Sequence, residues 1–159
     1  MSSFSFSIDV PVRGEWKNVS LLVTSVQNCF SAMFSEVDGA NALAMIAGEL
    51  MENAIKYGNW GAQPGFLRLG VHGSNGGARV CVRNPVSPEN LKKLGDTLTW
   101  IKTFATPAEA FTARIQEVVG APRGESRLGL VRILYEADST LSYRAIDADV
   151  EVTAEVAIP

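Results

Sequence analysis

The stretch of sequence that decides the fold is GELMENAIKYG, residues 48–58. An α-helix turns by about 100° per residue, so Glu49 and Asn53 lie about 40° apart around its axis, and Lys56 lies about 20° from Glu49 on the other side. The apolar residues of this region share an adjacent face: Leu43, Ile46, Leu50, Ala54 and Tyr57. The pattern predicts a helix over Ala40–Tyr57 that packs on a core and carries a short polar stripe. An ordinary amphipathic helix with a solvated charged face would give a similar pattern.

Strand and helix patterns alternate on both sides of this helix. Strands are expected where apolar and polar residues alternate, at Phe4–Val10, Phe66–His72, Ala78–Arg83, Thr140–Arg144 and Val150–Ile158. Helices are expected where apolar residues recur every three or four positions, at Trp16–Val37, Ala40–Tyr57, Pro88–Phe104, Pro107–Val119 and Leu128–Ala137. Pro11 to Glu15 should break the first strand, Asp38-Gly39 should end the first helix, and Asn84-Pro85 should end the third strand.

Short links join most of the consecutive strands, and Gly73–Gly77 carries a strong hairpin-turn signal. Such links favour antiparallel pairing. The element order therefore predicts an α+β fold, a two-layer α/β sandwich whose mixed, mainly antiparallel sheet is covered on one face by helices. A length of 159 residues fits a single domain, 1–159, with a lid-like insertion at about 88–126.

Composition narrows the function classes. A hydrophobic content of 47% with 19% charged residues is typical of a folded chain rather than a disordered one. The net charge is −3 and no basic stripe is visible, so we expect no nucleic-acid partner. Cys29, Cys81 and the single histidine, His72, have no metal-ligand spacing. Neither a signal-peptide pattern nor an apolar run of about 18 residues occurs, so we expect no membrane span and a cytoplasmic location.

The motif Glu49-x-x-x-Asn53-Ala54-x-Lys56-Tyr57 resembles the N-box of the histidine-kinase-like ATPases, the Bergerat or GHKL fold. Within that group the chain is most similar to the anti-sigma-factor serine/threonine kinases. The resemblance implies that Asn53 binds the Mg²⁺ ion carried by ATP, that Glu49 is the general base, and that Lys56 adds positive charge near phosphate. The chemistry is consistent, because Mg²⁺ takes few protein oxygens and a carboxylate one turn away can reach an attacking hydroxyl.

A second segment, Ser126–Leu134, resembles the glycine-rich phosphate box of the same family. Gly129 would let the backbone come close to phosphate at a helix N-terminus, where free N–H groups favour anions. Arg127 stands where the family tends to have glycine. Arg127 or Arg123 would bind phosphate as a fork of donors. Alternatively, Arg127 fills the phosphate's space, or both arginines are simply exposed.

The adenine box departs from the family. In place of Asp-x-Gly-x-Gly the chain has Val82–Pro88, which contains neither Asp nor Gly. Asn84 would accept the adenine amino group's hydrogen bond through its side-chain oxygen, or it is a turn residue before Pro85. Pro85 and Val86 add bulk where the family's glycines let backbone approach the base.

The resemblance therefore leaves two functions open. In the first, the chain is an ATP-binding regulator in signal transduction, a serine/threonine kinase that transfers phosphate from Mg-ATP to a serine of a STAS-type (anti-anti-sigma) partner. In the second, it is a catalytically inactive binding module in a partner-switching pathway. An unrelated α/β domain with a chance motif is a third alternative. A homodimer is an arrangement that the sequence leaves open.

Overall fold

The structure is a computed structural model that describes residues 3–12, 19–34, 37–61, 65–74, 76–119 and 128–158. Within these ranges the elements follow the order β1 (Phe4–Val12), α1 (Val19–Met33), α2 (Val37–Tyr57), β2 (Gly65–Ser74), β3 (Gly77–Pro85), α3 (Pro88–Ile101), α4 (Pro107–Val119), α5 (Leu128–Glu136), β4 (Thr140–Ile146) and β5 (Asp149–Ala157). None of these helices is long and apolar enough to cross a lipid bilayer.

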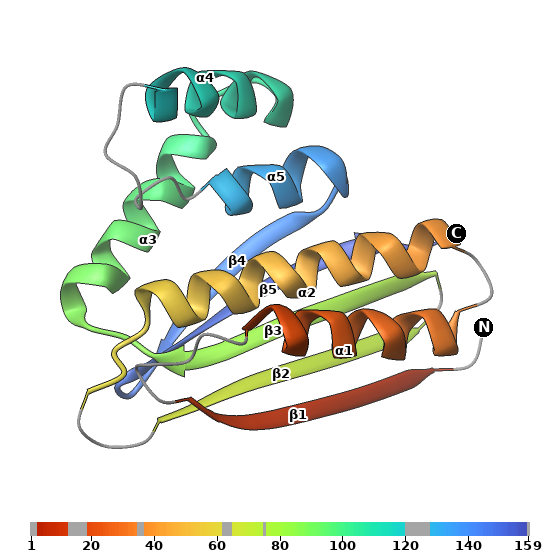
Figure 1. The fold of residues 1–159 in the computed structure, drawn as a ribbon. Helices are drawn as coiled ribbons and strands as arrows, with labels where there is room; N and C mark the ends of the chain where they lie inside the picture. The colour runs from red at the N-terminus through yellow and green to blue at the C-terminus, as the bar shows by residue number, and fades with distance from the viewer. Residues whose placement is uncertain are drawn as a thin grey trace.

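The strands form one sheet in the order β1-β2-β3-β5-β4. Each described pairing is antiparallel, with Leu69 of β2, for example, opposite Ile8 of β1 and Val82 of β3. Figure 1 shows α1 and α2 side by side over one face of this sheet, with α5 on the far side of α2. The predicted α+β class and the single helix-covered face are confirmed, and the sheet is antiparallel throughout the described strands.

Period-two alternation explains why only one face is covered. Leu67, Leu69 and Val71 of β2 are at most 1% exposed and face the helices, because successive strand side chains point to opposite faces. The intervening positions point to the open face, where cross-strand ion pairs lie: Asp9–Arg68, Arg79–Glu155, Arg83–Asp149 and Arg144–Glu151. The uncovered face is therefore solvated and the apolar one becomes the core.

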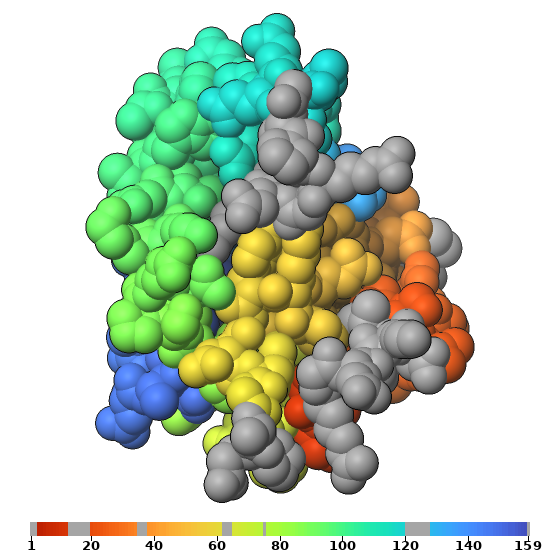
Figure 2. All heavy atoms as spheres, turned by 60° about the vertical axis from the view of Figure 1, so that its left-hand side comes forward, coloured from red at the N-terminus to blue at the C-terminus, as the bar shows by residue number. Residues whose placement is uncertain are grey.

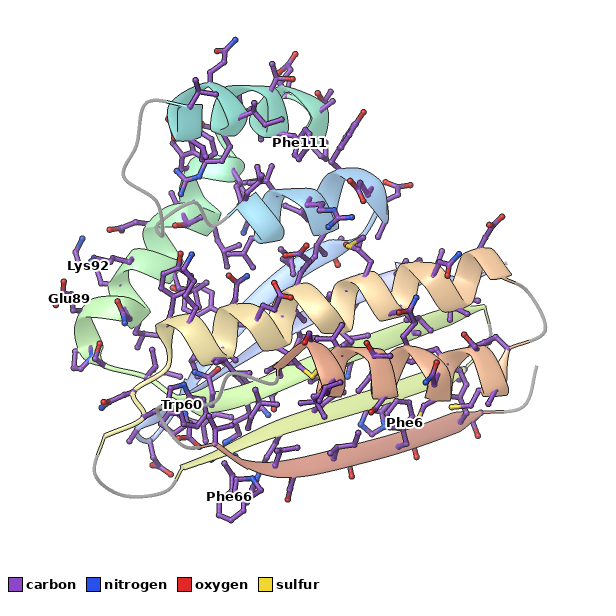
Figure 3. The ribbon with its side chains drawn as sticks, in the orientation of Figure 1. Phe6, Trp60, Phe66, Glu89, Lys92 and Phe111 are labelled. Carbon is purple, nitrogen blue, oxygen red and sulfur yellow. The ribbon has the colours of Figure 1, made fainter. Side chains whose placement is uncertain are left out.

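Helices α1 and α2 complete that core. Leu43, Ile46 and Met51 of α2 are fully buried, as is Phe30 of α1. Phe6, labelled in Figure 3, points from β1 to Phe30, with ring centroids 5.5 Å apart. The helical layer thus contacts the sheet as far as its β1 edge.

The insertion forms α3 and α4, which stand at one end of the helical layer (Figure 1). Helix α3 begins where predicted, because the Ser87 hydroxyl accepts a hydrogen bond from the Asn90 N–H and Pro88 occupies the first turn. Helix α4 is tied to α5 by Phe111, labelled in Figure 3, which stacks on Tyr135 with ring centroids 5.0 Å apart. The lid-like segment is thus packed on the rest of the fold through both of its helices.

Two predicted boundaries are wrong. Helix α1 ends at Met33, and Asp38 and Gly39 belong to the first turn of α2. An acidic residue is favourable there because of the helix dipole. A Cβ on Gly39 would lie 3.3 Å from Cγ2 of Ile158, so this glycine serves close packing rather than chain reversal. The predicted start at Trp16 lies outside the described residues.

Strand β1 also continues through Pro11 to Val12 instead of breaking. Proline is tolerated in a strand at the edge of a sheet, where its missing N–H faces away from the ladder. Because β1 is an edge strand, Pro11 does not end it.

We predict a large difference between two leucines on neighbouring helices. Leu43→Ala should destabilise the fold by about 2–5 kcal/mol, because it leaves a cavity in the core, whereas Leu21→Ala should change stability by less than about 0.5 kcal/mol. Leu43 is 0% exposed and Leu21 is 64% exposed. Urea denaturation of both variants checks this, and equal losses would contradict the placement of α1 and α2.

Candidate functional site

Helix α2 brings Glu49 and Asn53 to its side facing α5, one turn apart. The Glu49 side chain is 19% exposed. Asn53 is half-buried, and its amide nitrogen is buried without a hydrogen-bond partner. An unpaired buried donor is unfavourable, so it marks a place where a ligand or water would be stabilised. The two side chains line two different hollows.

Asn53 lines a partly open cavity of ≈ 40 Å³ between α2, β3, α3, α5 and β5. Its walls are mostly apolar, with Leu50, Val82, Leu94, Leu130 and Val152 among them. Three asparagines, Asn53, Asn84 and Asn90, also line it. On the face shown in Figure 2, α3 in green lies against the C-terminal part of α2 in yellow, beside this cavity. The cavity therefore combines an apolar wall with a few amide groups, as small-molecule sites do.

Asn84 faces the cavity because of strand period. Ala78, Val80 and Val82 are the buried positions of β3, and Asn84 continues the same stripe at 4% exposure. It lies within the strand rather than in a turn. Its amide nitrogen donates to the Pro85 carbonyl at 2.8 Å. Because the nitrogen is committed there, the amide oxygen is the group suited to accept a bond from a ligand.

The end of α2 is held by side chains from outside the helix. The Trp60 indole N–H donates to the carbonyls of Ala54 and Ile55, at 3.2 and 3.0 Å. The Asn90 amide donates to the Tyr57 carbonyl at 2.9 Å. Trp60 lies at this end of α2 in Figure 3. The bonds to Ile55 and Tyr57 reach carbonyls of the last helical turn, whereas the Ala54 carbonyl also accepts from the Gly58 N–H at 2.9 Å. The Asn90 bond ties α3 to the end of α2 beside the cavity.

Glu49 is held from α5. Its Oε1 accepts a hydrogen bond from Arg132 Nη1 at 2.9 Å, and Arg132 Nε donates to Glu136 at 3.0 Å. Its Oε2 lies against Gly129, where any Cβ would clash with it. The glycine of the resembled phosphate box thus makes room for a carboxylate of the chain itself.

Burial dominates the electrostatics of Glu49. Desolvation raises the pKa of its carboxyl above the ordinary value, and the hydrogen bond and charge of Arg132 lower it in part. The charges of Glu52 and Glu136 raise it further. A carboxylate with a raised pKa is a better proton acceptor than an exposed one, which suits a general base.

Glu49 opens onto a groove of ≈ 570 Å³ between α1, α2 and α5. Glu52, Arg132 and Glu136 line the same groove. Gly129 contacts Glu49 while the next residue, Leu130, lines the cavity. The first turn of α5 therefore lies between the groove and the cavity.

The remaining predicted residues are not all brought to this place. Lys56 is exposed, its ammonium 5.3 Å from the centre of the Tyr57 ring, and it lines neither hollow. Arg123 and Arg127 lie outside the described residues. The structure adds Arg132, Asn90 and Trp60, none of which was a predicted site residue, although Arg132 lies within the segment that resembles the phosphate box. The spacing of Arg132 from Gly129, three residues along a helix, was the one available signal.

The donor set fits ATP and Mg²⁺ in its chemistry. A half-turn of the Asn53 amide exchanges its two ends, so it can offer oxygen to a metal ion or nitrogen to phosphate. Asn84 offers an acceptor to a base. The volume fits only after a change, because small-molecule pockets span roughly 300–1,000 Å³ and this cavity holds ≈ 40 Å³. A nucleotide would need α3 or α5 to move away from α2.

We predict that the effect of Gly129→Ala on stability has opposite signs in the wild-type chain and in a Glu49→Ala background. In the wild-type chain the substitution should destabilise by about 0.5–1 kcal/mol, because the new methyl pushes the end of the Glu49 side chain into the groove and breaks its hydrogen bond with Arg132. In a Glu49→Ala background it should stabilise by about 0.5–1 kcal/mol, since alanine is the better helix former. Urea denaturation measures both. Gly61→Ala is the control, because a Cβ there meets nothing within 4 Å. Equal changes in stability in the two backgrounds would contradict the contact between Gly129 and the Glu49 carboxylate.

We also predict a pH-dependent effect of Glu49→Gln. Because the folded-state pKa of Glu49 is raised, folding favours the neutral carboxyl. This contribution is complete below the unfolded pKa and is lost as the pH rises through the folded pKa. The neutral glutamine variant should therefore be more stable than wild type at pH 7, and the difference should vanish below about pH 4. Urea unfolding at both pH values checks this, with Glu89→Gln on the exposed side of α3 as control (Figure 3). A less stable variant at pH 7 would contradict it.

Comparison with known proteins bears on the fold. The sequence matches no family model and no curated protein. Among solved structures, the chain is similar to one from the crystal structure of the SiaB-SiaC complex of Pseudomonas aeruginosa, with 16% sequence identity and a TM-score of 0.63. The likeness covers 96% of this chain and 89% of that chain. At this identity it establishes that the two chains share a fold over nearly their whole lengths.

Proposed function

We propose that this chain is an ATP-binding regulator of the partner-switching kind, which transfers phosphate to a serine of a protein partner. One observation carries the proposal: α2 has Asn53, whose amide nitrogen is buried and unpaired, on the cavity side of α5 and the half-buried carboxylate of Glu49 on the groove side. A phosphotransferase needs a ligand-binding group and a proton acceptor close together but facing different reactants. Their spacing is that of the N-box that the sequence resembles.

The cavity would bind the nucleotide, and the groove would bind the protein acceptor. On the cavity side, Asn84 would accept a hydrogen bond from the base and Asn53 would bind the metal ion or phosphate. ATP, when bound, supplies the phosphoryl group. On the groove side, Glu49 would take the proton from a hydroxyl that enters beside α1, since its carboxylate lines that groove. Separate approaches would keep the protein acceptor out of the apolar cavity. Because the first turn of α5 lies between the two hollows, that turn would have to move away from α2 before the hydroxyl oxygen could attack the terminal phosphorus of ATP and release ADP.

A protein partner is supported by the structural comparison. The similar chain comes from a structure of two proteins in complex, and the likeness covers 96% of the present chain. The class of partner, a STAS-type regulator, follows from the resemblance to anti-sigma-factor kinases. A hydroxyl on such a partner is the acceptor that Glu49 would serve.

A second function, a binding module without catalysis, is favoured by one specific observation. The cavity holds ≈ 40 Å³, and the Glu49 carboxylate is tied to Arg132 rather than free in the groove. A chain that stays in this closed form would bind its partner without nucleotide.

Calorimetry with ATP, with and without Mg²⁺, tests the first function. Wild type should bind no more tightly than tens of micromolar, about −6 kcal/mol, because Pro85 and Val86 crowd the base. Binding should require Mg²⁺ and weaken in Asn53→Ala, while the exposed Asn59→Ala leaves it unchanged. Glu49→Ala should retain binding and lower phosphate transfer by about 10²–10⁴-fold. Metal-independent binding that ignores Asn53 would contradict the site.

The binding-module alternative makes the opposite prediction. Wild type should give no heat with ATP but form a stable complex with a STAS-type partner, and Asn53→Ala should leave that complex intact. Titration of the partner into both proteins, followed by size-exclusion chromatography, checks this. A complex that forms only with Mg-ATP present would exclude the module.

A further inference from the structure

Arg132 connects two carboxylates on two helices. It donates through Nη1 to Glu49 on α2 and through Nε to Glu136 on its own helix, at 2.9 and 3.0 Å. The guanidinium is planar, so using one donor for Glu136 fixes the direction of the others. Glu136 is four residues further along α5, the spacing at which helical side chains are neighbours. Arg132 is therefore held from its own helix while it reaches across to α2.

The Glu49 carboxylate is bonded at one oxygen and has the other beside a glycine. Oε1 accepts the Arg132 bond and Oε2 lies against Gly129. Without Arg132, the carboxylate would keep only the contact with Gly129, and it could turn outward into the groove that it lines. Gly129 supplies the space, and Arg132 supplies the attraction that keeps the group there.

We infer that Arg132 is a positioning residue for Glu49, which holds the proton-accepting carboxylate at the boundary between the first turn of α5 and the groove. The inference rests on the proposed function, in which Glu49 takes a proton from the partner's hydroxyl. Arg132 acts through Glu49. Replacing Arg132 should therefore change the position and the pKa of the Glu49 carboxyl more than it changes ligand binding.

The charge state of Glu49 follows from the same arrangement. Burial favours the neutral carboxyl, which cannot accept a proton, and Arg132 lowers the pKa against that effect. Among the residues that the structure describes, the charged groups that act on Glu49 are Arg132 and Glu136 from α5 and Glu52 from α2, and Asp38 of α2 lines the same groove. From α1, the groove is lined by Val23 and Gln27, which do not titrate. Removing Arg132 should therefore raise the pKa of Glu49, and removing Glu136 should lower it.

The test is an NMR titration of the Glu49 carboxyl carbon in nucleotide-free protein, with the signal assigned by its loss in Glu49→Gln. Arg132→Met should move the midpoint upward, and Glu136→Gln should move it downward. Arg132→Lys should restore part of the wild-type value. Arg144→Met is the matched control, because Arg144 pairs with Glu151 on the open face of the sheet, and it should leave Glu49 unchanged.

The inference is overturned if Glu49 titrates identically in wild type and Arg132→Met while amide spectra show both folded. If Arg132→Met does not fold, an unchanged midpoint in Glu136→Gln overturns it instead. The proposed function is contradicted by a separate measurement, the absence of a calorimetric signal when ATP is titrated into wild type.

Where phosphate transfer is detected, the acid limb of its pH profile should shift to higher pH in Arg132→Met, with the KM for ATP unchanged. A raised KM with an unshifted profile would overturn the positioning role.

Discussion

The contact between α2 and the sheet is the interaction on which the rest of the molecule depends. Leu43, Ile46 and Met51 of α2 are 0% exposed, and the burial of these side chains fixes the rotation of α2 about its axis. Once that rotation is fixed, the 3.6-residue period determines where every other side chain of α2 points. Glu49 and Asn53 must then face α5. The site is thus a consequence of core packing, and a change that rotated α2 would move the carboxylate and the amide together.

Local pattern predicted most of the fold because its causes are local. Alternation along β2 and β5 and helical recurrence along α2 each arise from neighbouring residues, so the sheet and its covered face followed from sequence. The predicted boundaries were wrong where the role of a residue depends on contacts with residues distant in the sequence. Gly39 was expected to end a helix but makes room for Ile158, and Pro11 was expected to break a strand but lies at an edge. Neither role is visible without the neighbours.

The candidate site shows the same division. The spacing of Glu49 and Asn53 predicted that they share a helix side, but which hollow each lines depends on α5, about eighty residues further along the chain. Arg132 lies in the segment that resembles the phosphate box, but the resemblance gives it no role, and its bond to Glu49 joins residues 83 positions apart. The sequence left Asn84 as either an adenine acceptor or a turn residue. The strand register places it within β3, at a buried position. Long-range packing, which a single sequence does not display, supplied each of these answers.

Pro11 has a consequence for how this chain behaves at high concentration. An open sheet edge presents backbone donors and acceptors to any other chain, and it is a usual starting point for aggregation. Strand β1 is such an edge, and its ladder lacks an N–H at Pro11. A second molecule that added a strand beside β1 would forgo one hydrogen bond there, and the same deficit would recur with every further copy. The proline that the sheet tolerates thus works against its extension from molecule to molecule.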